Sequence, residues 1–323
     1  MTTPVSTIRS QPSQSNTSLP PGDGNAHEHD DNPEDILFDA LQTLYDYQPV
    51  TFTSAGASYT YTYPRSLTSS SIKITLRTPD TDAVNWSLHA SSVWIASTQL
   101  ANGINFLRID HHLQRIGSGG DGTKEDPERP LRLLELGASA GLPSILIARV
   151  FPDVSVVASD YPDSNIIRTL TQNIRDNGAE ANCHAAPFGW GTDPSPLFSL
   201  GKADGVYVGF DLIIAADTLW NPDLHSIFID TLQRTLRRDR HSRVHLVAGL
   251  HTGRYTIDSF LRSIRGVGFR VLEIMEREVT AAGGGEKAGS RQWDVARAEY
   301  EEEKDRRGWV IWIEICWEEC YVS

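Results

Sequence analysis

The residues best suited to chemistry lie in and just after residues 131–141, an apolar run that ends in a glycine turn. A second apolar run follows at once, so the pattern predicts a strand, a tight turn and a helix, which is how an α/β nucleotide site begins. Gly137 can adopt backbone angles that other residues avoid, and Gly141 lets the start of the helix lie close to a ligand. Asp160 ends the next apolar run, where an acidic side chain suits the two hydroxyls of a ribose. We therefore predict a nucleotide-type site at this turn.

The spacing within the turn indicates which kind of nucleotide it suits. The turn runs from Gly137 through Ala138 and Ser139 to Gly141, and Glu135 stands two places before its first glycine. The dinucleotide fingerprint G-x-G-x-x-G needs a third glycine, which this stretch does not have. The form E-x-G-x-S-x-G instead resembles the motif of S-adenosylmethionine-dependent methyltransferases, in which the middle position is often glycine. The alternative is an ordinary strand-to-helix turn of a Rossmann-like domain that does not bind this ligand.

Composition and charge limit the classes of partner. The chain has 323 residues, of which 39% are hydrophobic and 22% are charged, enough for one large domain or two small ones. Its formal net charge is −13, whereas a nucleic-acid-binding surface needs a basic face, so we expect no nucleic-acid partner. The charge suits a basic protein or a cationic amine as substrate, and plain solubility explains it equally well.

Cysteine usage and hydropathy bear on the compartment. The three cysteines, Cys183, Cys316 and Cys320, show neither a metal-type pairing nor a disulfide framework. Such usage is typical of a reducing compartment. No apolar run reaches transmembrane length, and the polar N-terminus has no hydrophobic signal core. We predict a cytoplasmic protein with no membrane partner.

Three segments differ in composition. Residues 1–33 carry almost no large apolar side chains and cannot bury enough surface to offset ordering, so we expect a disordered tail. The pattern of residues 34–86 predicts an N-terminal extension. It would contain a helix over 34–45 and a hairpin whose two strands lie within 51–63 and 71–76. Residues 87–323 form the main domain, which we expect to begin with a helix over 87–104 that has Trp94 on its inward side.

Strand and helix patterns alternate from residue 131 onward, which favours a parallel sheet with helices on both faces. The predicted strands are 131–136, 154–159, 181–186, 211–216 and 244–248, and the predicted helices are 142–150, 163–177, 222–237 and 256–266. The strands 269–277 and 309–317 then follow each other without a helix between them, so we expect an antiparallel pair at the end of the sheet. Together these elements predict the seven-stranded, Rossmann-like fold of class I methyltransferases.

Four motifs occur in order and carry a more specific resemblance. They are Leu-Glu-Leu-Gly-Ala-Ser-Ala-Gly-Leu-Pro-Ser from residue 134, Ser-Asp-Tyr-Pro-Asp from 159, Phe-Gly-Trp-Gly from 188 and Ala-Ala-Asp-Thr-Leu-Trp-Asn from 215. Over residues 88–317 the chain resembles the fungal nicotinamide N-methyltransferase-like family. Its members include protein N-terminal and lysine methyltransferases that act on a translation elongation factor. Where that family usually has Leu-Trp-Gly-His, this chain has Leu88, His89, Ala90 and Ser91.

The resemblance implies a set of cofactor-binding residues. Trp94, Gly137, Ala138 and Ser139 would lie beside the methionine part of S-adenosyl-L-methionine, in the motif that Glu135 begins. Asp160 would take the ribose hydroxyls, Trp190 would lie beside the adenine, and Ala216 would line the cofactor. Physical chemistry supports these roles, because an aromatic face suits a flat base and an indole suits a sulfonium cation. A core position in an amphipathic helix is the alternative for Trp94.

Asp217 and Trp220 correspond to the acidic-x-x-aromatic motif of the family, where the aromatic residue is more often Tyr or Phe. Ligands of open α/β sheets lie outside the carboxyl ends of the strands, so this segment should border the site. Asp217 could attract and orient a substrate ammonium, and Trp220 could hold a cationic amine by its ring face. The alternative for Asp217 is a helix N-cap. No Ser-His-Asp triad or metal-binding cluster is evident, and methyl transfer needs none.

We predict an S-adenosylmethionine-dependent N-methyltransferase that acts as a monomer on a protein lysine or N-terminal amine. On the resemblance, the protein substrate would be a translation elongation factor. A small-molecule amine such as nicotinamide is the alternative within the same class. An NAD-dependent oxidoreductase and a non-catalytic binding module are alternatives from other classes.

Overall fold

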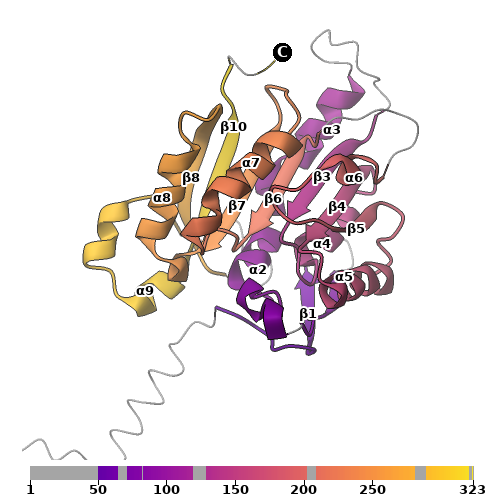
Figure 1. The fold of residues 1–323 in the computed structure, drawn as a ribbon, viewed down its shortest axis with the longest axis horizontal. Helices are drawn as coiled ribbons and strands as arrows, with labels where there is room; N and C mark the ends of the chain where they lie inside the picture. The colour runs from indigo at the N-terminus through magenta and orange to yellow at the C-terminus, as the bar shows by residue number, and fades with distance from the viewer. Residues whose placement is uncertain are drawn as a thin grey trace, which may run out of the picture. The chain divides into compact units, whose positions relative to one another are not determined.

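An eight-stranded sheet with the strand order β5-β4-β3-β6-β7-β10-β8-β9 forms the centre of the molecule (Figure 1). Its strands are β3 (Leu131–Leu136), β4 (Val154–Asp160), β5 (Cys183–Pro187), β6 (Leu212–Ala216), β7 (Arg243–Gly249), β8 (Phe269–Glu278), β9 (Ser290–Gln292) and β10 (Trp309–Trp317). The strands β3 to β7 pair in parallel. β3 and β4 are buried at every position, as expected of strands that are covered on both faces.

The structure is a computed structural model that describes residues 50–64, 71–81, 83–118, 129–201, 209–280, 289–319 and 322. All of them belong to one compact unit, which spans residues 47–323. The tail predicted over residues 1–33 and the helix predicted over 34–45 lie outside the described residues. Among the described helices, none is both long and apolar enough to span a membrane.

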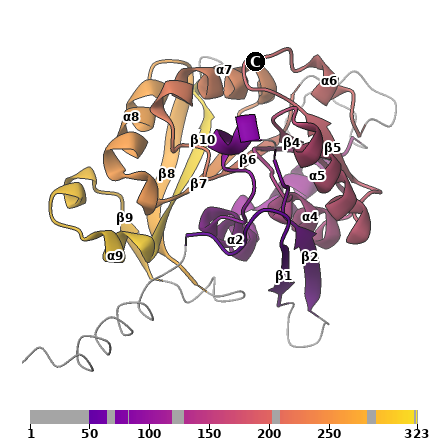
Figure 2. The ribbon, with the colours of Figure 1, turned by 60° about the horizontal axis from the view of Figure 1, so that its bottom comes forward.

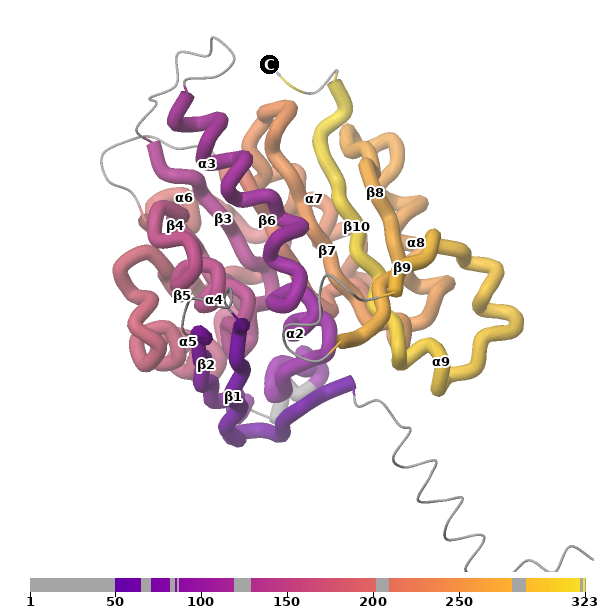
Figure 3. Tube along the Cα trace, turned by 180° about the vertical axis from the view of Figure 1, so that it is seen from behind, coloured from indigo at the N-terminus to yellow at the C-terminus, as the bar shows by residue number. Residues whose placement is uncertain are grey.

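Helices cover the sheet on two sides. α2 (Ile95–Asn102), α3 (Ile109–Gly117), α4 (Leu142–Val150) and α5 (Ser164–Asp176) contribute to one apolar core, which Figure 3 views from the side of α2 and α3. α6 (Ser195–Phe198), α7 (His225–Thr235) and α8 (Arg254–Ile264) contribute to the other, on the side that faces the viewer in Figure 1. Short 3-10 turns connect several elements: η1 (Ala83–Leu88), η2 (Ile104–Leu107), η3 (Pro222–Leu224), η4 (Leu250–Thr252) and η5 (Val295–Glu299).

The mostly parallel sheet with an antiparallel end is confirmed, and it has one strand more than the predicted seven. β10 lies between β7 and β8 and is antiparallel to both. The additional strand β9 pairs with β8. β9 has only three residues within a charged stretch, too few for a recognisable alternation of polar and apolar side chains.

The helix predicted over residues 87–104 is wrong in its first half. η1 ends at Leu88, and α2 begins only at Ile95, with Trp94 as an extended N-cap residue at φ −85° and ψ 153°. His89 has a positive φ of 54°, which a helix cannot contain. Trp94 instead forms an isolated bridge with Thr51, so a tertiary contact determines where this helix starts.

The predicted hairpin is formed by β1 (Ser58–Tyr63) and β2 (Ile72–Arg77), and it packs beside α4 and α5 (Figure 2). Asn173 of α5 and Asn177, the C-cap residue of α5, hydrogen-bond to the backbone of β2. The amide of Asn173 exchanges hydrogen bonds of 2.8–2.9 Å with the backbone of Arg77, and Asn177 does the same with Thr75. Asn173 also donates to the carbonyl of Ala140 at 2.9 Å, so α5 ties the hairpin to the glycine turn.

Candidate active site

The glycine turn after β3 has the geometry that its sequence predicts. Gly137 and Gly141 adopt φ angles of 76° and 87°, in the region that favours glycine. A Cβ atom on Gly141 would lie 2.5 Å from a methyl group of Leu170, and one on Gly137 would lie 3.1 Å from a methyl group of Thr218. The N–H groups of Gly137 and Ala138 both donate to the carbonyl of Ser159 at 2.9 Å, which holds the turn against β4.

Asp160, at the end of β4, faces this turn. One carboxylate oxygen accepts the N–H of Ser139 at 2.6 Å, and the other accepts the N–H of Tyr161 at 2.7 Å. Burial raises the pKa of Asp160 to about 6, while these two N–H groups act in the opposite direction. A carboxylate has about four acceptor positions, so about two remain for the hydroxyls of a ligand.

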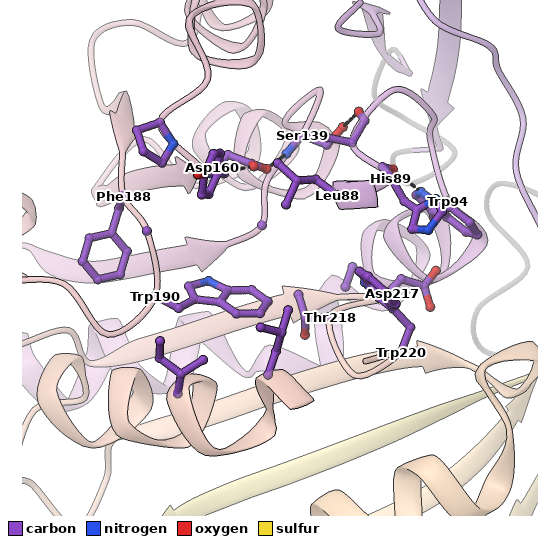
Figure 4. A pocket seen from close by; sticks show the side chains of 18 of the residues that line it. Leu88, His89, Trp94, Ser139, Asp160, Phe188, Trp190, Asp217, Thr218 and Trp220 are labelled. Carbon is purple, nitrogen blue, oxygen red and sulfur yellow. Dashed lines mark hydrogen bonds between the residues drawn. The ribbon is translucent and has the colours of Figure 1, made fainter. Parts of the chain in front are cut away.

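A cavity of about 650 Å³ opens in front of the turn (Figure 4). This volume lies within the range of pockets that hold small molecules or cofactors, about 300–1,000 Å³. The structure brings eight of the ten predicted site residues to its wall: Trp94, Gly137, Ser139, Asp160, Trp190, Ala216, Asp217 and Trp220. The other two, Glu135 and Ala138, line an adjoining cavity of about 30 Å³.

Glu135 is hydrogen-bonded to the first turn of α4, the helix that follows the glycine turn. Its carboxylate accepts the backbone N–H of Ser144 at 3.1 Å and also the hydroxyl of Ser144, in the first turn of α4. Burial raises the pKa of Glu135 to about 8, and the charge of Asp160 adds to this shift. Glu135 therefore caps the helix that follows the turn, next to the smaller cavity.

One end of the large cavity combines two aromatic rings with a carboxylate. Figure 4 places Asp160, Phe188 and Trp190 at this end. Trp190 packs against Phe228 of α7 with ring centroids 4.7 Å apart, which fixes the plane of the indole. The N–H of Gly191 donates to the hydroxyl of Thr231 at 2.8 Å and anchors the loop that carries Trp190. A planar base could lie against this indole.

Four rings form the opposite end, which we call the aromatic compartment: His89, Trp94, Trp220 and His251 (Figure 4 labels the first three). The ring of His89 meets Trp220 edge-on at 5.0 Å and Trp94 edge-on at 5.9 Å. His251 stacks on Trp94 at 5.6 Å and 15°. The indole N–H of Trp94 donates to the carbonyl of His89 at 2.8 Å. Such faces can hold a cationic amine.

Sequence reasoning missed two of these four residues. His89 was seen only as a departure from a family pattern, and its side chain reaches the cavity because the chain turns at that residue. His251 stands in η4, directly after the carboxyl end of β7. The rule that ligands lie outside the carboxyl ends of parallel strands was the signal that could have identified it.

Asp217 holds the aromatic compartment together. One oxygen of its carboxylate accepts the N–H of Ala96, in the first turn of α2, at 3.3 Å, and the other accepts the N–H of Gly249 at 2.7 Å. Burial raises the pKa of Asp217, while the charge of His251 and the two N–H groups oppose that shift. Asp217 itself adopts a positive φ of 52°. It therefore connects the segments that carry Trp94 and His251.

The suggestion that Asp217 caps the helix that follows it in the chain is wrong. Asn221 has that role, because its side chain accepts the N–H of Asp223 at the start of η3. Asp217 donates its own backbone N–H to Val247 in β7, which turns its side chain toward α2.

The segment around His89 closes over the glycine turn. The hydroxyl of Ser139 donates to the carbonyl of Ala90 at 2.5 Å. Asn85 of η1 donates to the carboxylate of Asp163, the N-cap of α5, at 2.6 Å. Within the described residues, no group of three or more His, Cys, Asp or Glu side chains could hold a metal ion.

The sequence was compared with models of known protein families and with known proteins. A family model described as lysine methyltransferase matches residues 81–265, more than half of the chain. The protein is 37% identical over 134 residues to the protein N-terminal and lysine N-methyltransferase efm7 of Neurospora crassa, a match that covers 38% of this chain and 47% of the relative. It is 34% identical over 159 residues to the protein of the same name from Gibberella zeae, a match that covers 46% of this chain and 60% of that relative. The corresponding protein of Schizosaccharomyces pombe is 27% identical over 199 residues, covering 60% and 70%.

The chain thus spans about half the length of the curated relative from Neurospora crassa. Among solved structures, the fibrillarin/Nop5p complex resembles it with a TM-score of 0.38 and 14% identity, over 64% of this chain and 81% of that one. The match to the family model covers β3 to β7 and the walls of the large cavity. The chain belongs to the lysine methyltransferase family.

Proposed function

We propose that the protein is an S-adenosylmethionine-dependent N-methyltransferase that methylates a lysine or N-terminal amine of another protein. The observation that carries this proposal is a single cavity with two chemically different ends. One end has a glycine turn, a buried carboxylate and a flat indole, and the other has four aromatic rings around Asp217. A cofactor and an acceptor amine could therefore meet between them.

The residues at the first end fit the cofactor. A side chain on Gly137 would crowd the space beside Thr218, so glycine leaves room for a ligand against the turn. Asp160 would accept hydrogen bonds from the ribose hydroxyls, Trp190 would stack on the adenine, and Ser139 and Ala216 would line the methionine part. When bound, the cofactor supplies a methyl group activated by a positive sulfonium.

The second end would bind the acceptor. The rings of Trp94 and Trp220 offer faces to an ammonium group and exclude water around it. His89 at this end is exposed, and the cavity also reaches Tyr161 and Ile227, which are 45% and 40% exposed. The exposure of these lining residues shows that the cavity is open to solvent. An open cavity supports a protein as acceptor, because a small amine would need a closed pocket to gain comparable burial.

The relatives support the choice of substrate. Three of them, cited above, are named protein N-terminal and lysine N-methyltransferases. From the resemblance of the motifs, we propose a translation elongation factor as the first substrate to test and the cytoplasm as the place of action. The net charge of −13 suits a basic partner.

Two measurements test the proposal. Calorimetry should detect binding of S-adenosylhomocysteine and none of NADH, and the reverse would favour an oxidoreductase. The chain should then be incubated with cofactor labelled in the methyl group and with fungal lysate, and the protein and small-molecule fractions counted separately, with the Asp160→Ala chain as control. Label in the small-molecule fraction alone would replace the protein substrate by a small amine. Cofactor binding without any transfer would leave a binding module.

A further inference from the structure

His251 occupies a defined position that neither the motifs nor the proposed roles explain. It lies in η4, immediately after β7, and lines the large cavity at its aromatic end. Its half-buried ring stacks on Trp94 at 5.6 Å with an angle of 15° between the planes. Trp94 is in turn fixed by its hydrogen bond to the carbonyl of His89. The imidazole therefore has one preferred face contact and forms part of the cavity wall.

Gly249 makes this position possible. Its φ of −68° is open to any residue, so backbone strain does not explain the glycine. A Cβ atom at this position would lie 2.2 Å from Nδ1 and 2.3 Å from Cε1 of His251, closer than atoms can approach. The ring thus folds back over the backbone of Gly249, whose N–H donates to Asp217 at 2.7 Å. The same residue positions both the imidazole and the carboxylate.

Asp217 is the acidic residue whose carboxylate interacts with the ring of His251 through charge. The two groups lie close enough for the charge of His251 to lower the pKa of Asp217 against the effect of burial. α2 carries no charged side chain. From α8 comes Arg254, which is paired with Glu276 and Glu301. The short helix α9 (Glu303–Arg307) also packs against η4, and all five of its residues are charged. Glu303 pairs with Arg307.

We propose that His251 is the proton acceptor for the substrate ammonium, with Asp217 stabilising the imidazolium that forms. The inference rests on the proposed function, since it assigns a role in amine methylation. An N–H bond of the ammonium breaks, a new N–H bond forms on the neutral imidazole, and the electron pair stays on the amine nitrogen. The amine is then neutral and its electron pair is free, as methylation requires. The imidazolium returns the proton to water after the product leaves.

The test is the pH dependence of kcat/KM for methylation of a purified fungal translation elongation factor between pH 7.5 and 10. His251→Gln keeps a polar side chain of similar size but cannot take up the proton. We expect it to reduce kcat/KM about 100-fold at pH 7.5, a typical contribution of general base catalysis. The deficit should shrink toward pH 10, because a lysine amine with a pKa of about 10.4 then becomes neutral without help. For an N-terminal amine, with a pKa of about 8, the deficit should shrink from pH 8 upward.

The matched control is His89→Gln, the same change in the same aromatic compartment, and it should alter kcat/KM by one factor at every pH. Gly249→Ala is a second test, because it keeps the imidazole but pushes it away, and it should reproduce the pH-dependent deficit. Melting temperature and S-adenosylhomocysteine affinity show that each variant is folded. A deficit of His251→Gln that is equal at all pH values, or absent, overturns the inference alone. Absence of transfer by the unaltered chain overturns the proposed function and this inference with it.

Discussion

The substitution Asp217→Asn distinguishes two possible roles of this residue. Asp217 could only contact the substrate, or it could also connect two segments of the site. The carboxylate uses one oxygen for Gly249 and the other for Ala96, at 2.7 and 3.3 Å. Asparagine has one acceptor oxygen, so its NH₂ group must face one of these N–H donors. If the shorter bond to Gly249 is kept, the N–H of Ala96 loses its partner in the first turn of α2.

The cost follows from these two contacts. A hydrogen bond to a charged group contributes about 1.5–3 kcal/mol, and loss of an N-cap costs about 0.5–2 kcal/mol. We expect a loss of about 2 kcal/mol in the free energy of unfolding, or about 4–8 °C in melting temperature for a domain of this size. A residue that caps with one oxygen would tolerate the change, because Asn caps about as well as Asp.

Thermal unfolding checks this expectation, with Asp223→Asn as the matched control, since Asp223 is exposed and lies only a few residues away. S-adenosylhomocysteine affinity should stay within about threefold of the unaltered chain, because Asp217 lies beyond the cofactor end of the cavity. Methyl transfer should fall more than tenfold, since Trp94 and His251 lose their common anchor. A melting temperature equal to that of the control would refute the anchoring role.

Three further changes test other parts of the structure. Asp160→Ala should weaken S-adenosylhomocysteine binding by about 1–3 kcal/mol in calorimetry, because the ribose loses a charged acceptor; unchanged affinity would exclude Asp160 from the site. Trp220→Phe should retain more methyl transfer than Trp220→Ala, because a ring face survives, and equal losses would argue against a cation–π contact. Burial lowers the pKa of His112 to about 4 and that of His245 to about 3, below the ordinary value of 6.5. Their contribution to stability is therefore complete above pH 6.5 and is lost as the pH falls from 6.5 toward these values. Burial raises the pKa of Glu135, so the contribution of Glu135 to stability grows as the pH falls. The effect of one histidine is therefore measured as a difference: urea unfolding at pH 7 and at pH 5 is compared between the unaltered chain and His112→Gln. The variant should lose less stability on acidification, by up to about 1.4 kcal/mol per pH unit, and identical losses would contradict the reasoning.

The sequence by itself determined the features that depend on neighbouring residues. The helix predicted over residues 142–150 coincides with α4, and the strand over 131–136 coincides with β3. Both are mostly apolar segments on either side of glycines that the turn requires, so local pattern and backbone geometry agree. The position of Asp160 beside Ser139 follows as well, because consecutive parallel strands end at the same edge of the sheet.

Only the tertiary structure decided how the aromatic compartment is built. Trp94 starts α2 instead of lying within a longer helix because Thr51 and Asp217 hold that end of the helix, and Asp217 is 121 residues away from Ala96. His251 enters the site through a ring contact with Trp94 and a space left by Gly249. Periodicity describes which face of one segment is apolar, and it contains no information about contacts between segments so far apart. The glycine turn could therefore be predicted from the sequence. The partners of Asp217 and the position of His251 depended on how α2, β6 and β7 pack against one another.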